Sequence, residues 1–133
     1  MLSGCRGGSP IQHTVAAWVE AWNRRDLAAM EAAFRPGGQF TGVDGNAGPP
    51  AAQRLAFQPM WGLVPDIRMR VTRWIPTEHG IAFSWAAEGH ARSAVVALRG
   101  IAVVEGSAGH VRAMRLYGDV RPLLALLPRR EEK

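Results

Sequence analysis

The chain is poor in two residue types: it has one cysteine, Cys5, and one lysine, Lys133. A single cysteine cannot form a disulfide within the chain, so the fold must be held together by its core. Disulfide frameworks are typical of secreted proteins and rare in the reducing cytoplasm. The sequence therefore predicts a cytoplasmic protein without a disulfide.

Long apolar runs are also missing, and none approaches the roughly 20 residues that a membrane-spanning helix needs. Of the 133 residues, 47% are hydrophobic and 20% are charged, which is ordinary for a globular domain. This length allows one core and not two independent halves. We expect a flexible tail over residues 1–10, one domain over 11–127, a charged tail over 128–133 and no membrane partner.

Positive charge is in excess, with a net charge of +5 and a pI near 10.9. Nucleic-acid binding needs clustered Lys and Arg to neutralise phosphates. Here the arginines are scattered along the chain, apart from a few close groups such as Arg24 with Arg25 and Arg129 with Arg130. We therefore expect no nucleic-acid partner.

Metal and phosphate motifs are not found. The four histidines and the single cysteine do not follow metal-ligand spacing. The Gly-rich stretches GGSP and GVDGNAGPP lack the strand-to-helix context of a phosphate-binding loop. The sequence thus predicts neither a metal site nor a cofactor.

The first half of the chain has helical periodicity. An apolar stripe at helical spacing begins at Ile11 and ends at Trp22, and Asp26 is a plausible N-cap for a second, shorter helix that stops at Pro-Gly-Gly. QFTGV reads as a brief strand. A third helical stretch covers residues 51–65 and is interrupted by Pro59.

The second half alternates with the period of β-strands. Strand candidates cover residues 66–75, 81–91, 94–106 and 110–119, and short turns join them. Sequential strands joined by short turns form an antiparallel sheet. Helices followed by a meander predict an α+β fold, in which the helices cover one face of a curved sheet.

Asp119 stands between the last strand and a short apolar helical segment, LLALL. Its carboxylate can cap that helix, or it can point into a cavity and move a proton. Strict alternation places Arg115, Tyr117 and Asp119 on one face of the strand. If that face is the inner one, the positive charge of Arg115 lowers the pKa of Asp119. The sequence leaves open whether Asp119 caps the helix or moves a proton in a cavity.

His90 and Glu88 fall on the face of their strand opposite Trp85, unless a bulge near Gly89 changes the register. In a pocket, the histidine and the carboxylate would form a proton shuttle. On the outer face, the pair would be solvated or lie in a dimer interface.

Nearly the whole chain, from about residue 11 to residue 127, resembles the nuclear transport factor 2 superfamily, and within it the SnoaL-like cyclases and ketosteroid isomerase relatives. The matching stretches are VAAWVEAWNRRDLAAMEAAFRPGGQFTG, GIAFSWAAEGH and VVALRGIAVVEGSAGHVRAMRLYGDVRPLLALL. They include a helix with an aromatic stripe and a last strand that ends in an aromatic residue, one further residue and an aspartate. The resemblance implies a cone-shaped scaffold with an apolar pocket.

The catalytic groups of two branches are not kept. The resemblance places the isomerase's oxyanion-hole tyrosine on Trp18, its general base near Gly42 and its protonated acid at or near Gly100. Asp44 lies two residues past the expected base. The final-strand acid of the epoxide hydrolase branch falls on Leu116.

The cyclase branch asks only for an acid or base at the end of the last strand, and Asp119 occupies that position. The resemblance thus implies that Asp119 moves the proton, that Tyr117 or Trp18 donates to an oxyanion, and that Arg115 supports the aspartate. Further residues are expected to line the pocket: Trp18, Trp22, Phe40, Asp44, Trp61, Phe83, Trp85 and Leu98.

Two functions follow as alternatives. The first is a SnoaL-like, cofactor-independent enzyme of cyclase, isomerase or hydrolase type, acting by acid/base chemistry on a hydrophobic carbonyl or polyketide-like small molecule. The second is a non-catalytic module of the same fold that binds a small ligand or another protein. In both cases we expect a homodimer formed through the outer face of the sheet.

Overall fold

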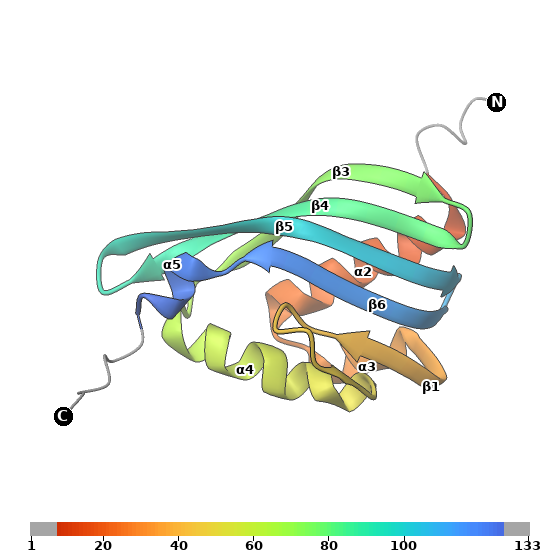
Figure 1. The fold of residues 1–133 in the computed structure, drawn as a ribbon, viewed down its shortest axis with the longest axis horizontal. Coiled ribbons are helices and arrows are strands. Elements are labelled where there is room, and N and C mark those ends of the chain that lie inside the picture. The colour runs from red at the N-terminus through yellow and green to blue at the C-terminus, as the bar shows by residue number, and fades with distance from the viewer. Residues whose placement is uncertain (1–7, 127–133) are drawn as a thin grey trace.

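The computed structural model describes residues 8–126 and shows helices packed on one face of a curved sheet (Figure 1). The helical elements are α2 (Pro10–Arg24), α3 (Leu27–Ala32), the 3-10 turn η1 (Pro50–Ala52), α4 (Gln53–Leu63) and α5 (Arg121–Leu124). The strands are β1 (Phe34–Thr41), β2 (Ala47–Gly48), β3 (Arg68–Thr77), β4 (Gly80–Ala91), β5 (Ala94–Ser107) and β6 (His110–Asp119). The predicted α+β class is confirmed. Within the described residues, no helix has the length and hydropathy to cross a membrane.

The six strands form one sheet in the order β2-β1-β6-β5-β4-β3. Hairpins join β3 through β6 and make an antiparallel meander, as predicted. The pairing of β1 with β6 is parallel, so the expectation of a wholly antiparallel sheet is wrong at this pair. Because most of the chain separates these two strands, no tight hairpin dictates their relative direction.

The first two helices start at side-chain caps. Ser9 Oγ accepts a hydrogen bond from the backbone N–H of Gln12 at 3.2 Å, and Pro10 occupies the first turn of α2. Asp26 caps α3 as predicted, since its Oδ1 accepts from the backbone N–H of Ala29 at 3.1 Å. The domain expected from residue 11 thus begins its first helix at Pro10. Most of the two expected tails, 1–10 and 128–133, lies outside the described residues.

Two element boundaries differ from the local rules. Strand β1 begins at Phe34 and runs through the Pro-Gly-Gly segment that was expected to end a helix. A register shift between Phe34 and Gln39 accommodates this segment, where Gly37 has a φ of +81°. Helix α4 continues through Pro59, which is exposed on the outer side of the helix.

A bulge in β6 changes which side chains point inward. Val111 pairs with Gly106 and Ala113 pairs with Glu105, so Arg112 is an extra residue without a partner on β5. After this bulge Met114 and Leu116 are buried against the helices. The residues that alternate with them face outward.

Aromatic side chains dominate the core between the sheet and the helices. Trp18, Trp22 and Phe83 have 1%, 0% and 0% of their surface exposed. Gln53 is fully buried among them. Its Oε1 accepts from Trp18 Nε1 at 2.7 Å, and its Nε2 donates to the carbonyl of Pro50 at 3.0 Å.

We expect Gln53→Leu to destabilise the protein by roughly 1–3 kcal/mol, because it leaves the buried indole N–H of Trp18 without an acceptor. The double variant Trp18→Phe, Gln53→Leu should lose less than the sum of the single variants, since it removes donor and acceptor together. Urea unfolding measures these differences. Additive losses would contradict an energetic link between the two side chains.

Candidate functional site

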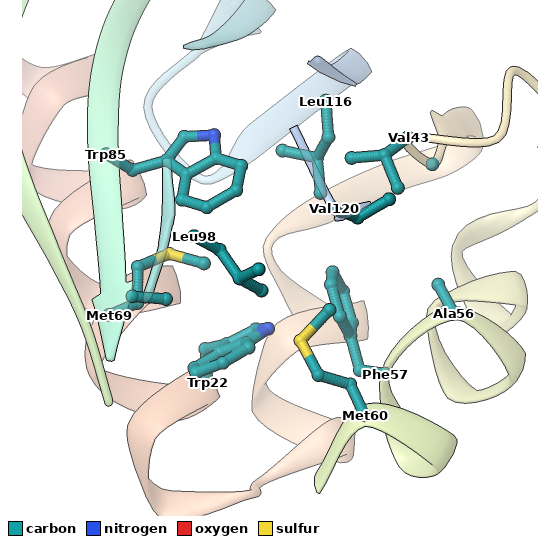
Figure 2. A pocket seen from close by; sticks show the side chains of 12 residues that line it. Trp22, Val43, Ala56, Phe57, Met60, Met69, Trp85, Leu98, Leu116 and Val120 are labelled. Carbon is teal, nitrogen blue, oxygen red and sulfur yellow. The ribbon is translucent and has the colours of Figure 1, made fainter. Parts of the chain in front are cut away.

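An apolar pocket lies between the inner face of the sheet and α4 (Figure 2). Its lining comes from α2, the β1–β2 loop, α4, the strands β3 to β6 and the start of the C-terminal segment: Trp22, Gly42, Val43, Ala56, Phe57, Met60, Met69, Trp85, Ala87, Leu98, Leu116 and Val120. The enclosed cavity measures about 30 Å³. The empty space between the surrounding atoms reaches about 410 Å³ when the opening to solvent is included.

This lining contains no ionisable side chain. The only side-chain N–H groups in it belong to the indoles of Trp22 and Trp85. Both indole nitrogens are buried and have no hydrogen-bond partner among the described residues. The pocket therefore presents an apolar surface without charge, and these two indoles are the only side-chain N–H donors among its lining residues.

A second apolar groove, of about 240 Å³, adjoins the pocket at α4 and α5. The two cavities share Gly42, Val43, Ala56 and Met60. Asp44 lines this groove, and its carboxylate accepts hydrogen bonds from the backbone N–H of Asn46 at 2.9 Å and from its Nδ2 at 3.0 Å. Asp44 directly follows Val43, which lines both cavities.

Three of the eight side chains predicted to line the pocket do so: Trp22, Trp85 and Leu98. Asp44 lies in the adjoining groove. The other four, Trp18, Phe40, Trp61 and Phe83, are not among the residues that line the pocket.

These four side chains support the core around the pocket. Trp18 donates its indole N–H to Gln53, so this group is not free for an oxyanion. Phe40 and Trp61 pack on Phe57, with ring centroids 5.5 and 5.9 Å apart, while Phe83 packs on Trp74 at 5.4 Å.

The predicted catalytic face of β6 points away from the pocket. Tyr117 is 54% exposed, and Arg115 and Asp119 are also exposed. The expected inward orientation of these three residues is wrong, because alternation counted from Val111 does not allow for the bulge at Arg112. A catalytic role that depends on this orientation has no geometric support.

Asp119 binds the first residue of α5. Its Oδ1 accepts from the backbone N–H and the Nε of Arg121 at 3.1 and 2.9 Å, and its Oδ2 accepts from Nη2 at 2.7 Å. These hydrogen bonds lower the pKa of Asp119 to about 2. Arg115 instead lies 3.9 Å from Glu105, so the expected pairing of Arg115 with Asp119 is wrong.

His90 and Glu88 lie on the exposed outer face of β4, opposite Trp85. The partner of His90 is Asp66: Oδ2 lies 2.9 Å from His90 Nδ1, and Oδ1 accepts from the backbone N–H at 2.6 Å. These hydrogen bonds lower the pKa of Asp66. The dyad therefore holds the end of the α4–β3 connection against β4 and does not reach the pocket lining.

None of the residues that α4 and β6 bring to the pocket was predicted from the sequence as part of its lining. Ala56, Phe57 and Met60 form one helical face, so their spacing could have identified them. Leu116 was considered only as a position where an acid is missing. Within the described residues there is no group of three or more His, Cys, Asp or Glu side chains that could hold a metal ion.

Two of the three positions matched to catalytic carboxylates lie at the pocket. Gly42 and Leu116, matched to the isomerase base and to the final-strand acid, are part of its lining. Gly100, matched to the protonated acid, is not in this lining, and an added Cβ there would overlap the backbone oxygen of Tyr117 and lie 2.7 Å from Cζ2 of Trp85. None of the three positions carries a carboxylate in this chain.

We expect a carboxyl signal with a pKa of about 2 for Asp119 in a ¹³C NMR titration. Arg121→Gln should raise this pKa towards 3.8, because it removes the positive charge and the two guanidinium hydrogen bonds, whereas the matched Arg115→Gln should leave it unchanged. Since folding lowers the pKa, the contribution of Asp119 to stability is complete above pH 3.8 and is lost as the pH falls towards 2. A shift in Arg115→Gln alone would contradict the geometry.

The comparisons with known proteins agree with this architecture. No curated protein sequence matches the chain. Among solved structures, AclR, a proposed hydroxylase from Streptomyces galilaeus, is 20% identical with a TM-score of 0.74, and the match covers 89% of this chain and 97% of AclR. Wild-type IdmH, a proposed polyketide cyclase from Streptomyces antibioticus, is 16% identical with a TM-score of 0.74, covering 87% and 96%.

TerC, crystallised with polyporic acid, is 13% identical with a TM-score of 0.75, and the match covers 89% of this chain and 98% of TerC. At such identities the likeness shows a shared fold. A family model for the SnoaL-like domain matches residues 15–114. The chain therefore belongs to the SnoaL-like domain family.

Proposed function

We propose that the protein binds a small hydrophobic molecule in the pocket between the sheet and α4. The observation that carries this proposal is an apolar pocket without an ionisable group in its lining, next to an apolar groove that shares four of its residues. Burial of apolar surface supplies the affinity of such a site. The crystallisation of TerC with polyporic acid supports the idea that this scaffold accepts a small molecule.

Ligand binding requires the mouth of the pocket to open. An enclosed volume of about 30 Å³ holds on the order of one water molecule. The adjoining groove is lined by α4 and α5. Helix α4 contains Pro59, which has no backbone N–H to donate, and α5 spans only four residues, so neither helix is strongly held in place by its own hydrogen bonds. A modest displacement of these helices joins the pocket to the groove.

The test is calorimetric titration with indane, a compact hydrocarbon. Ala56→Leu places a larger side chain at a residue that lines both the pocket and the groove. Because this side chain excludes the ligand sterically, we expect indane to bind at least tenfold more weakly. Ala28→Leu makes the same change at an exposed position of α3 that lines neither the pocket nor the groove, and it should leave the affinity unchanged. Equal effects of the two substitutions, or no binding to the unmodified protein, would reject the proposal.

A second candidate is an enzyme in which Asp44 acts as general base. The observation that favours it is the position of Asp44 in the groove, two residues after Gly42, the matched base position. Opening of the mouth would expose the carboxylate to a ligand held in the pocket. The chemistry would be removal of a proton from the carbon beside a carbonyl group.

Hydrogen–deuterium exchange at C2 of 1-indanone in D₂O tests this second candidate. Asp44 would take the proton from C2, and the resulting enolate would recover a deuteron from solvent. Proton NMR should show exchange accelerated by the unmodified protein and by Asp119→Asn, but reduced to the buffer rate by Asp44→Asn. If Asp44→Asn exchanges as fast as the unmodified protein, Asp44 is not the base.

We further propose that the protein forms a homodimer through the outer face of the sheet. Ile101 and Tyr117 are paired neighbours on β5 and β6 and are 46% and 54% exposed, and Val95 on the same face of β5 is 68% exposed. Exposed apolar side chains gathered on one face are typical of interaction surfaces. A second copy of the chain would cover them.

Light scattering coupled to size-exclusion chromatography should give the mass of a dimer, about twice 14.4 kDa. Ile101→Glu should shift this mass to that of the monomer, because it places a charge in the proposed interface. Leu55→Glu changes a side chain that is 82% exposed on α4 and serves as the control. A monomeric mass for the unmodified protein would disprove the proposal.

A cytoplasmic location and the lack of a nucleic-acid partner remain predictions. They rest on the single cysteine and on the scattered arginines of the sequence.

A further inference from the structure

We propose that the indole N–H groups of Trp22 and Trp85 select a ligand that carries a hydrogen-bond acceptor. The preferred ligand is then a neutral, apolar molecule with a carbonyl-type oxygen, which binds more tightly than a hydrocarbon, an alcohol or an ion of the same size. This inference rests on the proposed binding function and specifies the chemistry of its ligand.

Two buried indole donors in the pocket lining have no acceptor among the described residues. Trp22 has none of its surface exposed and Trp85 has 4%, and neither indole nitrogen has a hydrogen-bond partner. A buried N–H group without a partner is costly, because folding removes the water that satisfied it. An acceptor delivered by a ligand recovers part of that cost.

The other tryptophans with buried indole nitrogens serve as the comparison. The N–H of Trp18 is satisfied by Gln53 at 2.7 Å. The indole nitrogen of Trp61 has no partner among the described residues either, but Trp61 does not line the pocket. Trp22 and Trp85 are thus the two unpartnered indoles of the described residues that a pocket ligand can reach through the lining.

The two donors lie on opposite sides of the pocket (Figure 2). The nitrogen of Trp22 is on the ring edge turned towards Phe57 and Met60, and the nitrogen of Trp85 is on the ring edge away from Trp22. The rings of Trp22 and Phe57 meet edge to face, with centroids 5.7 Å apart and an interplanar angle of 83°. Contact with an aromatic face satisfies an N–H group only weakly, so a carbonyl oxygen competes well with it.

The rest of the lining explains the selection against other polar groups. A water molecule or a hydroxyl group can accept from an indole, but it also brings O–H donors that need acceptors. Among the lining side chains, only the sulfur atoms of Met60 and Met69 can accept, and thioethers are weak acceptors. A carboxylate would lose its hydration without meeting a cation. A carbonyl oxygen accepts and brings no donor.

The experiment compares 1-indanone with indane, which has the same ring skeleton without the oxygen. Calorimetric affinities for both ligands are measured with the unmodified protein and with Trp22→Phe, Trp85→Phe and the control Trp61→Phe. We expect at least one of the first two variants to weaken 1-indanone about three- to tenfold more than indane, the value of one net hydrogen bond. Trp61→Phe should change both affinities equally. The ratio of the 1-indanone affinity to the indane affinity is compared between each variant and the unmodified protein, so the difference in hydrophobicity between the two ligands cancels.

Indole N–H signals in ¹⁵N-correlated NMR spectra of the unmodified protein provide a second measurement that does not depend on how the variants fold. Addition of 1-indanone should shift the Trp22 or the Trp85 indole proton downfield while leaving that of Trp61 in place, and indane should produce no such downfield shift. If both ligands bind but neither the ratio nor the indole signals distinguish them, the inference is wrong and the binding function stands. If neither ligand binds, both are wrong.

Discussion

The packing of Phe57 against the aromatic side chains around it holds α4 over the inner face of the sheet. The rings around Phe57 come from α2, β1 and α4 itself: Trp18, Trp22, Phe40 and Trp61. Aromatic pairs in edge-to-face and stacked arrangements favour one relative orientation of the elements that carry them. This cluster therefore sets the distance between α4 and the sheet, and with it the size of the pocket.

The same packing determines the chemistry that the pocket offers. Residues chosen to fill a core are apolar, so the only polar side-chain groups left in the lining are two indole N–H groups and two methionine sulfur atoms. The positions where related scaffolds are expected to carry carboxylates, such as Gly42 and Leu116, are apolar here. A shared fold is thus compatible with very different activities, because a few positions at the pocket decide the chemistry.

The extra residue in β6, Arg112, decides which side chains of this strand face the pocket and which face outward. Alternation makes every residue after a bulge change sides, so Leu116 points inward and Tyr117 outward. Asp119 follows on the outer side and binds Arg121, which leaves its carboxylate ionised and away from the pocket. The contrast between Leu116 and Tyr117 shows how a shift of one residue reassigns a whole set of candidate residues.

Local patterns in the sequence determined the element order, the α+β class, the Asp26 cap and the inner face of β4, because periodicity and capping depend on neighbouring residues. The resemblance to a known family, and not these patterns, named Trp22, Trp85 and Leu98 among the expected pocket residues. Only the tertiary structure decided the parallel pairing of β1 with β6, the bulge at Arg112 and the acceptor of the Trp18 N–H, Gln53. Each of these depends on contacts between segments far apart in the chain, where local preferences are weak and the packing of the core selects the arrangement.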